Sequence, residues 1–84
     1  MRRKKGRRPG LYLRVPSQQS REFTKSQQYL EIFEGELPVY FFFLDTQKLV
    51  CAPQRLWITF NKPLYCQLAR ILGTENVVLV EPER

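Results

Sequence analysis

The run Val39-Tyr40-Phe41-Phe42-Phe43-Leu44 is the most apolar stretch of this 84-residue chain. It consists of β-branched and aromatic residues and is too short for a typical helix, so it predicts a strand. Asp45-Thr46-Gln47-Lys48 then predicts a tight turn into a further strand over Leu49-Val50-Cys51-Ala52. We therefore expect a hairpin. The first strand of this hairpin is apolar on both faces. We therefore expect either that it lies in the centre of a sheet or that another part of the protein covers it.

The residues before this hairpin predict a strand and a helix. Apolar residues alternate with Tyr12 and Arg14 from Leu11 to Val15, which is the pattern of a half-buried strand, and Pro16 ends it. Ser17 or Ser20 can cap a helix that extends to about Glu34. Its apolar face consists of Phe23, Tyr29, Leu30 and Phe33. We expect Gly35 to end this helix in the left-handed conformation.

The residues after the hairpin predict a second helix and a last strand. Leu56-Trp57-Ile58 either continues the third strand past a bulge or begins a bracing segment, and the pattern leaves both open. Asn61 is an expected N-cap, Pro63 fits the first turn, and Gly73 is the expected stop. The shared apolar face of this helix consists of Leu64, Tyr65, Leu68, Ile71 and Leu72, whereas Cys66 and Arg70 point outward. Residues 76–80 complete the order β-α-β-β-α-β.

This order predicts an α+β fold with a four-stranded mixed sheet and two helices packed on one face, as in ferredoxin-like or related split βαβ folds. In the ferredoxin-like arrangement the second strand lies at an edge of the sheet. The apolar character of residues 39–44, the second strand here, disfavours an edge position. Residues 10–84 are expected to form a single small domain. We expect residues 1–9 to be a disordered basic arm, because a block of like charges buries too little apolar surface to fold.

The net charge of +6 is concentrated in this arm. Its basic residues are Arg2, Arg3, Lys4, Lys5, Arg7 and Arg8. The remaining eight basic residues balance eight acidic ones, so the body is neutral. The arm predicts weak, salt-sensitive and nonspecific DNA contact, and a solubilising linker explains it equally well.

Residue types suited to catalysis or to holding a cofactor are sparse. The chain has no histidine and no CxxC pair, so we expect no metal, no cofactor and no catalytic residue. Cys51 and Cys66 fall in different elements and give no disulfide framework. No apolar run is long enough for a signal peptide or a membrane span, so we expect a cytoplasmic protein without membrane contact.

The aromatic strand predicts a surface for binding as well as a core. The sheet face turned away from the helices would expose some of Tyr40, Phe42 and Leu44, and an uncovered apolar patch usually marks a docking site. The alternative is that these side chains are simply core. An RNA-recognition motif would need stacking aromatics on the third strand, but residues 48–52 contain neither an aromatic residue nor a glycine.

The stretch from Leu11 to Val80 resembles the C-terminal subdomain of the bacterial DNA polymerase III alpha subunit, the replicative polymerase. The residues that carry the resemblance are Leu11-Tyr12-Leu13-Arg14-Val15-Pro16-Ser17, Leu37-Pro38-Val39-Tyr40, Leu56-Trp57-Ile58 and the segment LARILGTENVVL from Leu68 to Leu79. The resemblance implies a noncatalytic module, because the family's catalytic aspartates lie in a palm domain that this chain lacks. It also implies docking to a replisome protein such as the clamp-loader tau subunit, or to the remainder of an alpha subunit.

Two functions therefore follow from the sequence. The first is a docking module that acts in DNA replication, with the arm at most touching DNA. The second is an independent small nucleic-acid-binding protein that uses the basic arm, with body residues such as Arg14, Lys48 or Arg55 also in contact with the nucleic acid.

Overall fold

The fold is centred on two parallel strands that are joined by a helix. The computed structural model describes residues 9–80. Strands β1 (Gly10–Val15) and β3 (Val39–Phe43) lie side by side, with Leu11 opposite Val39 and Val15 opposite Phe43. Helix α1 (Arg21–Ile32) provides the crossover that parallel neighbours require.

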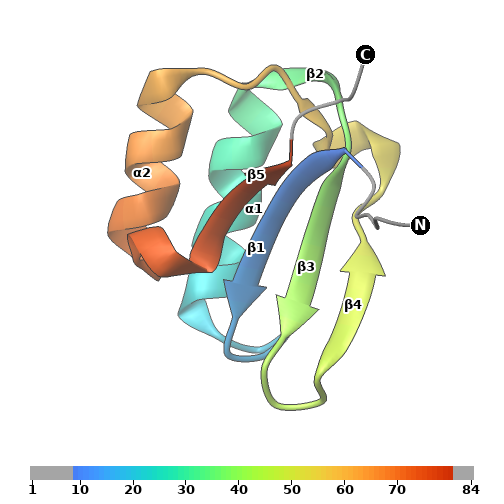
Figure 1. Cartoon of the computed structure of the whole chain (residues 1–84), viewed down its shortest axis with the longest axis vertical. Coiled ribbons are helices and arrows are strands. Elements are labelled where there is room, and N and C mark those ends of the chain that lie inside the picture. The colour runs from blue at the N-terminus through green and yellow to red at the C-terminus, as the bar shows by residue number, and fades with distance from the viewer. Residues whose placement is uncertain (1–8, 81–84) are drawn as a thin grey trace, which may run out of the picture.

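Two further strands complete the sheet. Strand β4 (Lys48–Cys51) pairs antiparallel with β3, and β5 (Val77–Val80) pairs antiparallel with β1. The order is β4-β3-β1-β5 (Figure 1). The predicted four-stranded mixed sheet with two helices is confirmed. Within it the most apolar strand, β3, is an interior strand next to β1, and not the edge strand that a ferredoxin-like order would make it.

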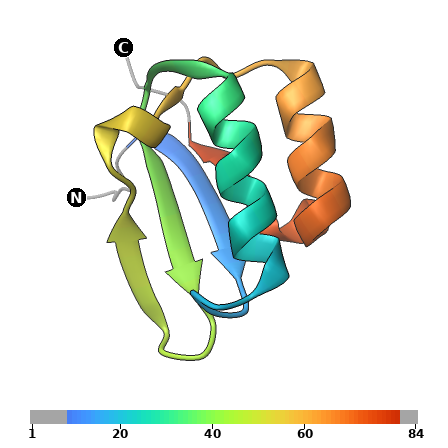
Figure 2. The same ribbon diagram turned by 180° about the vertical axis from the view of Figure 1, so that it is seen from behind.

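Both helices cover the same face of the sheet. Figure 2 shows α1 and α2 (Lys62–Leu72) side by side in front of it. The buried side chains beneath them come from alternate strand positions and from one stripe of each helix; they include Leu11, Leu13, Val15, Val39, Phe41, Phe43, Leu30, Leu64 and Leu68. Full burial of each such side chain contributes about 1.5–3 kcal/mol. The predicted apolar helix faces are confirmed for Phe23, Tyr29, Phe33, Tyr65 and Leu72, which pack against this core, but Ile71 is not one of the residues that do.

The helix ends test the predicted caps. The Ser20 hydroxyl accepts from the Phe23 amide (3.2 Å), and Asn61 Oδ1 accepts from the Leu64 amide (2.9 Å). Gly73 ends α2 with φ +95°, as expected. The expectation for Gly35 was wrong. Helix α1 ends at Ile32, and Gly35 lies in a short strand, β2 (Glu34–Leu37), without a positive φ.

The segment after β4 is a bracing segment. A 3₁₀ turn, η1 (Gln54–Leu56), leads out of the strand, and the Trp57 indole N–H donates to the Ala52 carbonyl (3.0 Å). Ile58 forms β-bridges with both Glu34 and Leu37. This resolves the two alternatives for residues 56–58, because the chain turns away from the sheet and pairs with β2.

The predicted hairpin between β3 and β4 is confirmed. Phe43 pairs with Lys48, and the Gln47 amide donates to the Phe43 carbonyl (2.7 Å) across the turn. A second 3₁₀ turn, η2 (Thr74–Asn76), connects α2 to β5. No helix within residues 9–80 is both long enough and apolar enough to cross a bilayer.

Candidate functional site

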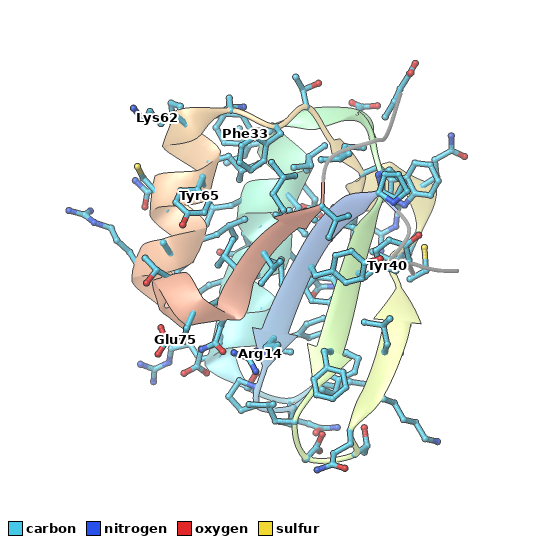
Figure 3. All side chains as sticks on the ribbon, viewed as in Figure 1. Arg14, Phe33, Tyr40, Lys62, Tyr65 and Glu75 are labelled. Carbon is cyan, nitrogen blue, oxygen red and sulfur yellow. The ribbon has the colours of Figure 1, made fainter. Side chains whose placement is uncertain are left out.

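The sheet presents one face that the helices leave uncovered, which we call the open face. It is lined by Tyr12, Arg14, Tyr40, Phe42, Leu49, Cys51 and Val78. Figure 3, drawn from the side of this face, shows Tyr40 on β3 and Arg14 near the far end of β1. These side chains share the face because residues at alternate positions of a strand point to the same side.

The strand register arranges these side chains in two rows. Tyr12 lies opposite Tyr40, with Val78 and Cys51 at the ends of the same row. In the next row Phe42 lies between its register partners Arg14 and Leu49. Two residues along a strand separate the rows, a distance of about 7 Å. The face therefore has an aromatic centre that crosses β1 and β3.

The first row contains a stacked aromatic pair. The rings of Tyr12 and Tyr40 have centroids 4.7 Å apart and planes 15° from parallel. The backbone of Gly10 passes directly beside Tyr40. A Cβ at Gly10 would lie 2.9 Å from the Tyr40 ring and 2.8 Å from the Pro38 carbonyl oxygen, and φ there is +153°. Only glycine lets the first residue of β1 run this close to the ring.

The second row contains the charged group of the face. Arg14 Nη2 donates to the backbone oxygen of Glu75 (2.8 Å), which ties the guanidinium to η2. Within residues 9–80, Arg14 is the one charged residue that lines the open face, and no carboxylate of this part of the chain lines it. The aromatic centre is thus flanked by a positioned cation.

A second apolar surface lies on the hairpin. Leu44, Leu49 and Val50 are 46%, 53% and 43% exposed, and we call these three residues the hairpin patch. Of the five exposed large hydrophobic residues in the described chain, three belong to this patch. Leu49 faces the open side of the sheet, whereas Val50 pairs with the core residue Phe41 and points to the opposite side. The patch therefore wraps around the β4 edge.

The residues predicted as a docking surface are divided between these two surfaces. Tyr40 and Phe42 are half-buried on the open face, as their strand positions predict. Leu44 lies in the turn after β3 and belongs to the hairpin patch. The arm residues, Arg2, Arg3, Lys4, Lys5, Arg7 and Arg8, lie outside the described residues.

Sequence reasoning missed Tyr12 as part of the site. It excluded a stacking platform because residues 48–52 contain no aromatic residue, but the stacked pair comes from β1 and β3. The signal was present, since the alternation from Leu11 to Val15 places Tyr12 and Arg14 opposite the buried face. Only the pairing of β1 with β3 brings Tyr12 beside Tyr40.

The other titratable groups in residues 9–80 are dispersed. No three of the cysteine and acidic side chains there come together as metal ligands, and both cysteines are exposed thiols. Glu31 forms an exposed salt bridge with Arg55 (3.4 Å). Arg55, one of the basic residues considered for nucleic-acid contact, is thus already paired with a carboxylate, and such exposed pairs contribute about 0–1 kcal/mol.

The fold and these surfaces define a two-layer α+β domain, with two helices on one face of the sheet and an aromatic open face on the other. No protein-family model, no curated protein and no solved structure matches the chain. Its function must therefore be argued from its own surfaces.

Proposed function

We propose that this chain is a noncatalytic docking module that acts in DNA replication in the cytoplasm, like the C-terminal module of the DNA polymerase III alpha subunit that its sequence resembles. The observation that carries the proposal is the hairpin patch, in which three large apolar side chains are exposed within one hairpin. Apolar side chains gathered in this way mark interaction sites more often than isolated ones do.

The position of the patch suggests how a partner binds. Strand β4 is an edge strand of four residues, and all four are exposed. A partner segment that pairs along this edge gains main-chain hydrogen bonds and covers Leu49 on one side of the sheet and Val50 on the other. Leu44 extends the contact to the turn. In this proposal the partner is a replisome protein such as the clamp-loader tau subunit, or the remainder of an alpha subunit.

The basic arm has a supporting part in this proposal. Its six cations add weak phosphate contact that holds the module near DNA, while the hairpin patch provides the specific contact with protein. Protein docking should accordingly depend little on ionic strength, because apolar burial is screened far less than exposed charge.

The proposal is tested by substituting the hairpin patch. The double variant Leu44→Ser/Val50→Thr removes two exposed apolar side chains, keeps the net charge and retains a β-branched residue in the strand. We expect its affinity for the purified tau subunit, measured by surface plasmon resonance, to fall at least tenfold, which is about 1.4 kcal/mol.

Ile32→Thr is the matched control, because Ile32 is a 68% exposed apolar residue at the end of α1, away from the hairpin. It should bind tau like the unaltered chain. The proposal is rejected if the unaltered chain binds neither tau nor the remaining part of an alpha subunit, or if the double variant binds as tightly as the control.

A further inference from the structure

We propose that the open face binds single-stranded nucleic acid, with bases against the Tyr12–Tyr40 pair and Phe42 and with a phosphate at Arg14. This inference does not rest on the docking function, since it uses different side chains. It is carried by the two-row arrangement of the face and by Arg14, the one charged residue that lines the face within residues 9–80.

The aromatic groups are arranged for base contact. Tyr12 and Tyr40 already stack on each other at 4.7 Å, and a base can extend this stack or lie against the Phe42 ring in the next row. Stacking of this kind accepts any base, because every base has a π-face.

The spacing of the rows selects single strands. The rows lie about 7 Å apart, whereas neighbouring bases of a duplex strand rise by about 3.4 Å. Two bases that occupy both rows must therefore be splayed apart, which a single strand permits and a duplex does not. The face is also an exposed sheet surface of half-buried rings, which unpaired bases can reach.

The charge of the face complements a phosphate backbone. Arg14 is held in the second row by the Glu75 carbonyl, and no carboxylate of the described residues lines the face to oppose it. The same chemistry favours nucleic acid over an apolar protein segment, which would gain nothing from Arg14.

The test is a fluorescence-anisotropy titration of the full chain with labelled oligothymidylate, oligouridylate and a duplex of equal length. Tyr40→Leu/Phe42→Leu removes both β3 rings from the face but keeps apolar bulk. We expect single-strand affinity to fall at least about fivefold, the lower limit for the loss of one base stack. Tyr65→Leu on α2, in the helical layer, is the matched control and should leave the affinity unchanged.

A second variant leaves the packed rings intact. Arg14→Gln should lower the slope of log affinity against log salt by about 0.7, the value for one phosphate contact on a single strand. A loss below fivefold in the ring variant, an unchanged slope in Arg14→Gln, or duplex binding as tight as single-strand binding would each overturn the proposal. Preference for either oligothymidylate or oligouridylate supports it and identifies the nucleic acid as DNA or RNA.

Discussion

Gly35 is packed closely against a segment that is distant in the sequence, the chain around Thr59. Its amide donates to the Trp57 carbonyl (3.0 Å), and the Thr59 amide donates to the Phe33 carbonyl (2.8 Å) beside it. A Cβ at Gly35 would collide with the backbone nitrogen and the hydroxyl of Thr59. Because one of these atoms belongs to the backbone, a side-chain rotation cannot relieve the collision.

We therefore expect Gly35→Ala to lower the free energy of unfolding by about 1–3 kcal/mol, the usual cost of overpacking. Urea denaturation followed by circular dichroism measures it. Glu34→Ala, at the exposed neighbouring position, should change stability by less than about 0.5 kcal/mol. Equal stabilities of the two variants would show that β2 and the bracing segment are not in contact.

Two glycines show where sequence reasoning succeeds at this scale and where it fails. Gly73 is needed for a local reason, its φ of +95° at the end of a helix, and the helical pattern before it identified that role. Gly35 is needed because Thr59 lies against it. The sequence around Gly35 does not indicate this contact, because Thr59 is distant along the chain.

Helix α2 begins with a cap that serves two segments. Asn61 Oδ1 accepts from the Leu64 amide (2.9 Å), and Asn61 Nδ2 donates to the Thr59 carbonyl (2.9 Å). The side chain thus satisfies an amide in the first turn of the helix and also fixes the chain that enters it.

Asn61→Ala should destabilise the protein by about 1 kcal/mol, because the cap and the link to Thr59 are both lost. Asn61→Asp keeps the capping oxygen and should recover most of this loss. Thermal unfolding of the three proteins measures the difference. If Asn61→Asp were as unstable as Asn61→Ala, the link to Thr59 rather than the cap would be the main contribution.

An apolar stripe at helical spacing predicted α1 and α2 and alternation predicted β1, whereas β3, β4 and β5 were predicted from short apolar runs and the turn residues beside them. Strand β2 was missed. Its sequence, Glu34-Gly35-Glu36-Leu37, has only one large apolar residue, and its bridges go to a single residue, Ile58. A strand of this kind is defined by its partner and not by its own pattern.

Strand order is the feature of the whole molecule that the sequence left open. The double-sided apolar character of β3 indicated an interior place but could not identify its neighbours. Strand β3 pairs with β1 on one side and with β4 on the other, and this order places Tyr12, Tyr40 and Phe42 on one surface. The candidate site is therefore a consequence of topology, since its residues come from strands on either side of a helix.

This order predicts a gradient of backbone protection across the sheet. Strands β1 and β3 are paired on both sides and carry the buried residues Leu13 and Phe41, whereas β4 is an exposed edge. Amide hydrogen exchange followed by NMR should show β1 and β3 amides exchanging at least about tenfold more slowly than those of β4, because edge strands open with less free energy. If β3 lay at an edge, alternate amides of Val39–Phe43 would exchange as fast as those of β4. That result would contradict the order β4-β3-β1-β5. Selective slowing of β4 when tau is added would place the docking contact on that edge, whereas slowing confined to β1 and β3 would place it elsewhere.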